Sequence, residues 1–144
     1  MFTACGNRTN QHNADASNFD FGDFPKTWER FGITNNDTVS YQPCNASNPQ
    51  FIISPDAKKI QIMMGNEVDA TCKIISLTHS DKTLTICLDE NKDGIKSCTF
   101  TWVDKKHFVG KWYLNNESDN TYEYLPKYLL DRHERITEKC NDEQ

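Results

Sequence analysis

Residues 72–114 decide the fold, and they read CKIISLTHSDKTLTICLDENKDGIKSCTFTWVDKKHFVGKWYL. Apolar and polar residues alternate along this stretch in successive runs, and short polar segments separate the runs. Alternation with a period of two is typical of strands that bury one face. The stretch therefore predicts a continuous antiparallel meander, with a central hairpin formed by Thr83–Asp89 and Ile95–Val103.

The lengths of the loops in this meander predict how its strands pair. We expect loops at His79–Lys82, at Asn91–Gly94 as a type I turn with a glycine bulge, and at Lys105–His107. The expected cross-strand pairs are Leu77–Leu84, Ile75–Ile86, Leu88–Cys98, Ile86–Phe100, Leu84–Trp102, Phe100–Trp112 and Trp102–Gly110. Each loop brings large apolar side chains to the same face of the sheet. The predicted core therefore contains Ile75, Leu77, Leu84, Ile86, Leu88, Cys98, Phe100, Trp102, Trp112 and Leu114.

Shorter strands are expected on the N-terminal side of the meander. They are Thr38–Cys44, Phe51–Ser54, Lys59–Met64 and Val68–Thr78. Pro55 fits the second position of a type I turn between two of them. Residues 25–31 fit either a helix that Pro25 opens and Gly32 ends, or a first strand that points Trp28 into the core. We favour the strand, because a turn and clearly extended sequence follow.

The C-terminal residues predict a helix over residues 126–139, because Pro126 suits the first helical position. Its expected buried stripe is Leu129, His133, Ile136 and Cys140. With the strands, this helix predicts one mainly β domain over residues 24–144. We expect an antiparallel barrel or sandwich, a meander of about eight strands, with the C-terminal α-helix over one open end.

Composition and charge narrow the possible partners. The chain has 144 residues, of which 36% are apolar and 26% are charged, and its net charge is −5. A nucleic-acid partner is not expected, because binding to phosphates requires a basic surface. The apolar runs are all shorter than the roughly 20 residues that a membrane-spanning helix needs. The sequence therefore predicts a soluble globular domain.

The six cysteines favour an oxidising compartment. None of them forms a C-x-x-C pair, so zinc ribbons and thioredoxin-type sites are not expected. Scattered cysteines in a small polar β protein are more often disulfides, and free buried thiols are the alternative. The expected register points Cys87 and Cys98 to opposite faces, with Cys98 in the core. A bridge between these two residues is therefore not expected.

The N-terminus Met1–Asn7 reads MFTACGN. It resembles the end of a bacterial lipoprotein signal, in which small residues precede the cysteine that receives lipid, although the apolar stretch before them is absent here. The resemblance implies lipid on Cys5, attachment to the membrane only through that lipid, and a place in the periplasm or cell envelope. Residues 1–23 would then form a flexible tether. A secreted eukaryotic glycoprotein is the alternative, because glycosylation sequons begin at Asn7, Asn36, Asn45 and Asn116.

Catalytic signatures are lacking. The histidines are isolated, and the sequence contains no G-x-S-x-G, P-loop or G-x-G-x-x-G motif, so we expect neither an enzyme nor an organic cofactor. One motif resembles half of a calcium loop, with oxygen ligands at Asp89, Asn91, Asp93 and Ser97. Phe100 stands where an EF-hand needs its last glutamate. Alternatively, Asn91 and Gly94 are simply the residues that the turn requires.

Two functions are consistent with these features. The first is binding of a protein partner, as an inhibitor or immunity factor against an exported enzyme or toxin, for which an acidic surface is suitable. The second is a lipocalin-like carrier of a small apolar ligand, a resemblance based on the meander and on Trp28. The G-x-W signature of that group is replaced by Lys26-Thr27-Trp28. A lined cavity of several hundred Å³ would favour the carrier, and a fully packed interior would favour the protein binder.

Overall fold

The structure is a computed structural model, and it describes residues 21–42, 48–64, 69–115 and 122–137. The strands are β1 (Thr27–Thr34), β2 (Asp37–Gln42), β3 (Gln50–Ser54), β4 (Lys59–Met63), β5 (Asp69–His79), β6 (Thr83–Leu88), β7 (Ser97–Asp104), β8 (Val109–Leu114), β9 (Tyr124–Pro126) and β10 (Arg135–Thr137). A 3₁₀ turn, η2 (Lys105–His107), joins β7 to β8, and one short helix, α1 (Lys127–Leu130), follows β9.

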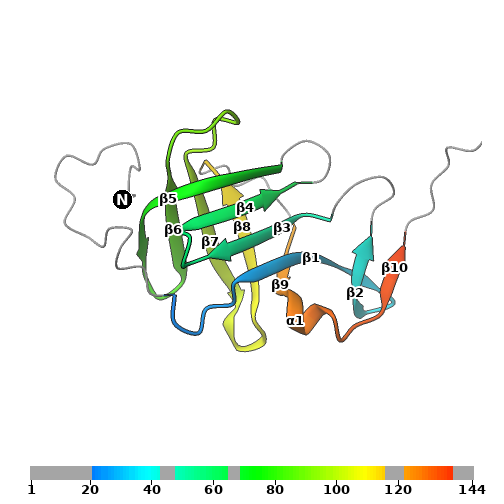
Figure 1. Ribbon diagram of the computed structural model, residues 1–144. Coiled ribbons are helices and arrows are strands. Elements are labelled where there is room, and N and C mark those ends of the chain that lie inside the picture. The colour runs from blue at the N-terminus through cyan, green and yellow to red at the C-terminus, as the bar shows by residue number, and fades with distance from the viewer. Residues whose placement is uncertain (1–20, 43–47, 65–68, 116–121, 138–144) are drawn as a thin grey trace, which may run out of the picture.

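Eight of the strands form a closed antiparallel barrel (Figure 1). The strands β3 to β9 follow one another around the barrel, and β1 closes it by pairing with both β3 and β9. The second half of β1 leaves the barrel and pairs with β2, and β10 adds to β2 in parallel. The predicted mainly β meander with a C-terminal helix is therefore confirmed, as a barrel. Closure leaves the eight barrel strands without a free edge.

The deep part of the barrel is filled by aromatic side chains. Five of them are completely buried, namely Trp28, Phe51, Phe100, Trp112 and Tyr124. Phe51 and Trp112 stack with ring centroids 4.5 Å apart, and Tyr124 meets Phe51 edge-on at 5.5 Å. Small barrels are commonly filled in this way, and aromatic pairs add about 0.5–1.5 kcal/mol each beyond their buried area. The same packing confirms the strand interpretation of residues 25–31, since Trp28 lies in β1 and points inward.

Gly110 in β8 allows an aromatic ring to pack directly against the backbone. A Cβ atom at this position would lie 2.1 Å from Cζ of Phe100, so the phenyl ring lies directly against the glycine backbone. Phe100 also contacts Trp28 and Trp112, with centroid distances of 4.7 and 5.2 Å. A side chain at position 110 would displace the ring at the centre of the aromatic cluster.

The pairing of β7 with β8 follows the predicted register. Phe100 pairs with Trp112 and Trp102 with Gly110, and η2 forms the connecting turn where it was expected. The pairing of β6 with β7 is shifted by two residues, so that Leu84 lies opposite Phe100. A shift of two keeps every side chain on its face, because side chains alternate along a strand.

The shift arises because the loop between β6 and β7 is longer than predicted. The turn at Asn91–Gly94 is present, but the strands resume only where Leu88 N–H bonds to the carbonyl of Lys96. Ile95 lies in this loop and is buried against the core. The loop therefore contributes its own apolar side chain to the barrel end opposite η2.

The predicted pairing of β5 with β6 was wrong. Leu77 pairs with Ile86, not with Leu84, because the turn after His79 is tighter than expected. A bulge between Ile74 and Ser76 then changes the alternation. Ile74 is consequently buried in the core, and Ile75, which was expected there, is only half-buried. Of the other expected core residues, Trp102 and Leu114 pack against the core partly buried, and the remainder lie in it.

The expected turn position of Pro55 was also wrong. The N–H of Lys58 bonds to the carbonyl of Pro55 at 3.1 Å, which makes Pro55 the first residue of the turn rather than the second. Lys58 takes the left-handed conformation that this four-residue connection needs, with φ of 55°.

The predicted helix over residues 126–139 was wrong in its length. Helix α1 ends at Leu130, which is fully buried, and residues 135–137 form the strand β10 beside β2. Of the expected helical stripe, Leu129 is half-buried, His133 is exposed and Ile136 lies half-buried in β10, whereas Cys140 is outside the described residues. Pairing of β10 with β2 satisfies backbone hydrogen-bonding groups on the edge of β2. A helix over the same residues would bury few apolar side chains, so it would be stabilised less.

Candidate functional site

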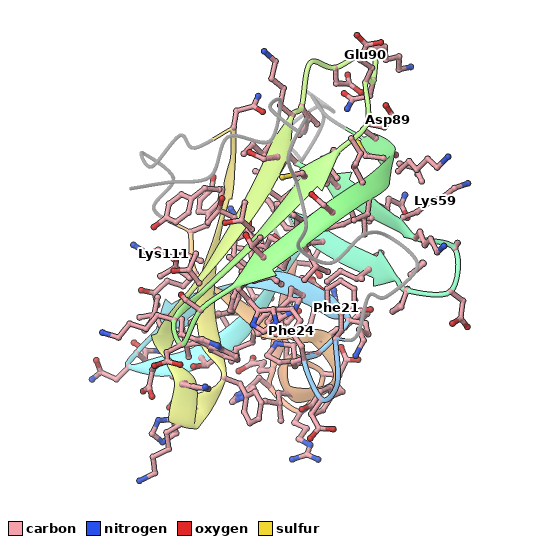
Figure 2. All side chains as sticks on the ribbon, turned by 90° about the vertical axis from the view of Figure 1, so that its left-hand side faces the viewer. Phe21, Phe24, Lys59, Asp89, Glu90 and Lys111 are labelled. Carbon is pink, nitrogen blue, oxygen red and sulfur yellow. The ribbon has the colours of Figure 1, made fainter. Side chains whose placement is uncertain are left out.

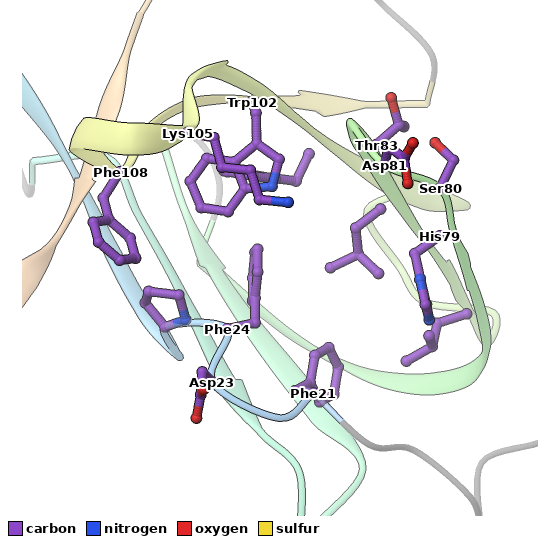
Figure 3. Close-up of a pocket in the computed structure, with 14 residues that line it drawn as sticks. Phe21, Asp23, Phe24, His79, Ser80, Asp81, Thr83, Trp102, Lys105 and Phe108 are labelled. Atoms are coloured by element: carbon purple, nitrogen blue, oxygen red, sulfur yellow. The ribbon is translucent and has the colours of Figure 1, made fainter.

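A pocket of about 440 Å³ opens at one end of the barrel, where β5 and β7 end and β6 and β8 begin (Figure 3). It is lined by Phe21, Asp23, Phe24, Pro25, Leu77, His79, Ser80, Asp81, Thr83, Leu84, Phe100, Trp102, Lys105 and Phe108. Ligand pockets of proteins commonly fall in this range of volume and combine an apolar lining with a few polar groups.

The inner end of the pocket is an aromatic floor. Phe24 meets Phe100 edge-on with ring centroids 5.0 Å apart, and it lies 6.0 Å from Trp102 and 5.4 Å from Trp28. Leu84 lines the same pocket. Because Phe24 and Phe100 join the pocket floor to the aromatic core, the space ends there and does not extend through the barrel.

One wall of the pocket is an N-terminal strap, residues 21–26, that crosses the barrel end before β1. Lys26 Nζ donates to the carbonyls of Gly22 at 3.1 Å and Phe24 at 2.5 Å, and Phe24 N–H donates to the carbonyl of Phe21 at 2.9 Å. The carbonyl of Lys26 accepts from Ile53 N–H of β3. The ordered domain thus includes Phe21, which the expected tether over residues 1–23 had excluded; residues 1–20 lie outside the described residues.

The opposite rim is polar and comes from the tight turn between β5 and β6. Ser80 N–H bonds to the carbonyl of Thr83 at 2.8 Å, and this turn places His79, Ser80 and Asp81 beside the opening. Figure 3 shows this polar rim across the pocket from Phe24 and Phe108. The pocket therefore offers an apolar surface on one side and hydrogen-bonding groups on the other.

The turn η2 completes the rim. Asp104 caps it by accepting from His107 N–H at 3.3 Å and by pairing with His107 Nδ1 at 2.8 Å. The hydrogen bond from the His107 side chain is the main reason that the pKa of Asp104 is lowered. Phe108 takes the left-handed conformation that ends the turn, with φ of 64°. This local geometry holds Lys105 and Phe108 at the pocket.

The residues of the calcium motif lie at the other end of the barrel, as Figure 2 shows for Asp89. Asn91 Nδ2 donates to the carbonyls of Asp89 at 3.0 Å and Ile95 at 2.7 Å, and its Oδ1 accepts from the N–H groups of Asp93 at 3.2 Å and Ile95 at 3.0 Å. The Asn91 side chain is thus engaged by its own loop, as the turn interpretation expects.

Ser97, the last residue of the calcium motif, is buried at the start of β7, whereas Asp89 and Asp93 are exposed. Among the described residues, no three His, Cys, Asp or Glu side chains gather as a metal site. Calcium binding at this loop remains a prediction that a titration can test.

Two cysteines lie inside the barrel as free thiols, Cys72 and Cys98. Burial raises the pKa of the Cys98 thiol well above its usual value, and the neighbouring Cys72 raises it further. A thiol that stays protonated is a poor nucleophile and a poor metal ligand. Cys98 therefore belongs to the core, and it forms no bridge to Cys87. Cys5, Cys44 and Cys140 are outside the described residues.

Sequence analysis predicted four of the pocket's apolar residues as core, namely Leu77, Leu84, Phe100 and Trp102, but it missed the strap and the rim. Phe21 lies in the polar stretch that was expected to form a tether, Phe24 directly follows that stretch, and Lys105 lies in a turn. The available signal was the sequence FDFGDF at residues 19–24, in which phenylalanines recur within an otherwise polar segment. Such residues need an apolar surface elsewhere in the fold, which here is the open end of the barrel.

No helix within the described ranges has both the length and the apolar character to span a bilayer. Comparison of the chain with protein family models, curated proteins and solved structures found no match.

Proposed function

We propose that this protein binds a small, mainly apolar molecule in the pocket at the barrel end and acts as a carrier or sequestering protein. The observation that carries the proposal is the pocket itself, about 440 Å³ with an aromatic floor and one polar rim. Hydrogen bonds within the strap and within the tight β5–β6 turn hold the walls of the pocket in place. Preformed walls reduce the entropy that binding costs.

The pocket favours the carrier over a protein-binding inhibitor or immunity factor. Large exposed apolar side chains in the described residues are Ile33, Val103, Phe108, Tyr122 and Tyr128. They come from four separate parts of the chain, and only Val103 and Phe108 share a hairpin. A docking site needs a contiguous apolar patch, and the carrier proposal rests instead on the apolar surface inside the pocket. A protein partner therefore stays a prediction from the sequence.

We also propose that the protein is exported, with lipid on Cys5 as its attachment to the membrane. Among the described cysteines, Cys72 and Cys98 are free, whereas Cys87 is not. A disulfide from Cys87 to a cysteine outside the described residues is part of this proposal, and it requires an oxidising compartment. The alternative of a glycoprotein would use Asn36, which is exposed in the β1–β2 turn.

Titration with N-phenyl-1-naphthylamine, an uncharged fluorescent probe, tests the carrier function. We expect saturable binding with one probe per chain. Leu84→Phe extends a side chain into the pocket and should weaken binding at least fivefold, which corresponds to about 1 kcal/mol. Ile33→Phe enlarges a side chain in β1 that is 61% exposed and does not line the pocket, so it is the matched control.

Both variants must unfold cooperatively in urea, which shows that they are folded and that their affinities can be compared. Equal affinities of Leu84→Phe, Ile33→Phe and the parent protein would show that the probe binds elsewhere. No binding by any of them would remove the support for a carrier.

A further inference from the structure

We propose that Lys105 recognises an anionic group on the ligand, so that the pocket selects amphipathic molecules with one negative charge. This inference rests on the proposed carrier function and adds the ligand's chemical class to it. The apolar body would lie on the floor formed by Phe24 and Phe100, and the charged group would remain at the solvent-exposed rim.

The position of Lys105 is the first support. Its backbone lies in η2 at the pocket opening, and Figure 3 shows its side chain beside Trp102 and pointing into the pocket. Among the described residues, no side chain or carbonyl forms a hydrogen bond or ion pair with its ammonium group. A lysine left without a partner beside an apolar floor is suited to an acidic group of a ligand.

The surrounding charges support the same assignment. Asp104, the acid next to Lys105 in sequence, is occupied by His107 at 2.8 Å. Asp23 lines the strap side, but Figure 3 shows its carboxylate turned away from the pocket. Lys26 of the strap is bound to two backbone carbonyls. Within the described pocket lining, Lys105 is thus the lysine that is free for a ligand.

Asp81 limits the charge that the ligand can carry. It belongs to the polar rim opposite Lys105, together with the hydroxyl groups of Ser80 and Thr83. A second negative group would face the carboxylate of Asp81 and be repelled. The pocket therefore favours a monoanion.

A pair of matched probes tests this inference. N-phenyl-1-naphthylamine and 1-anilinonaphthalene-8-sulfonate share the same aromatic body and differ by one sulfonate. We expect Lys105→Met to weaken binding of the sulfonate probe about fivefold and to leave the neutral probe unchanged, because a partly exposed ion pair contributes up to about that factor. Lys106→Met, in the same turn but outside the pocket lining, is the control and should change neither affinity. Asp81→Asn should strengthen binding of the sulfonate probe.

The outcomes separate this inference from the carrier function. If the neutral probe binds in the pocket and Lys105→Met leaves the sulfonate probe unaffected, the assignment of Lys105 is wrong and the carrier function stands. Equal weakening by Lys105→Met and Lys106→Met would indicate general attraction to a basic turn and would also overturn the assignment. If neither probe binds the folded parent protein, the carrier function itself fails.

Discussion

Gly110→Ala should be among the most destabilising single-methyl additions in this protein. The new Cβ would lie 2.1 and 2.2 Å from Cζ and Cε1 of Phe100, so the ring must move by more than 1 Å to restore ordinary contact at about 3.5 Å. Overpacking of a core costs about 1–3 kcal/mol. The ring also forms aromatic contacts with four neighbours, which are Phe24, Trp28, Trp102 and Trp112. Weakening two of these contacts adds about 1–3 kcal/mol. We expect a total loss of about 3–4 kcal/mol.

Gly94→Ala is the matched control for this substitution. Gly94 has φ of 69° and no atom within 4 Å of the added Cβ, so only backbone strain opposes the change, about 1–2 kcal/mol. Gly110 does not have a positive φ, so its cost comes from packing alone. Comparing the two substitutions therefore separates the cost of a steric clash, at Gly110, from the cost of a left-handed backbone conformation, at Gly94.

Urea unfolding followed by tryptophan fluorescence measures both losses. In a Phe100→Leu background, where the smaller side chain leaves room, Gly110→Ala should cost less than about 1 kcal/mol, which gives a clear coupling energy in a double-mutant cycle. The packing argument is refuted if Gly110→Ala costs no more than Gly94→Ala, or if its cost is the same with leucine at position 100.

Three other predictions concern the loops and the pocket. Asn91→Ala removes four hydrogen bonds within its loop and should lower the free energy of unfolding by about 2–3 kcal/mol in urea, and a loss below 1 kcal/mol would contradict the role given to this side chain. Because the folded state lowers the pKa of Asp104, the contribution of this carboxylate is present above its unfolded pKa and is lost as pH falls through the lower folded value. NMR titration of the carboxyl should therefore show a midpoint below the ordinary value for aspartate, and His107→Ala should raise this midpoint because it removes the side-chain hydrogen bond. Trp102→Phe should abolish ligand-dependent quenching of tryptophan fluorescence, because Trp28 and Trp112 are fully buried and Trp102 lines the pocket; quenching that persists would place the ligand elsewhere.

The sequence predicts the pairing of two strands best where the loop between them is short and its ends are clear. The turn at Lys105–His107 is short and polar, and its strands pair as expected. The Asn91–Gly94 turn also forms, but local turn chemistry does not determine where the strand ladder resumes, and Ile95 gains more from burial than from a place in a strand. The bulge after Ile74 has no signal in the sequence, because either neighbouring isoleucine can fill the core position.

The pocket depends on contacts between residues that are distant in sequence. Phe24 directly follows a polar N-terminal segment, and its place in the pocket depends on Phe100 and Trp102 of β7, which contact its ring. Likewise, Pro126 correctly marks the start of α1, but the free edge of β2 determines that the chain then becomes a strand. Composition and periodicity describe local preferences only. The position of Phe24 and the formation of β10 depend on surfaces that exist only after the chain has folded.

The filled interior of the barrel also constrains the kinetics of ligand exchange. If the protein is the proposed carrier, the rings of Phe24 and Phe100 block the path inward, so a ligand would leave through the opening by which it entered. Uptake and release then share one route, and two ligands cannot pass through in sequence. A membrane or protein that received the ligand from such a carrier would have to approach the barrel end that carries the strap and η2.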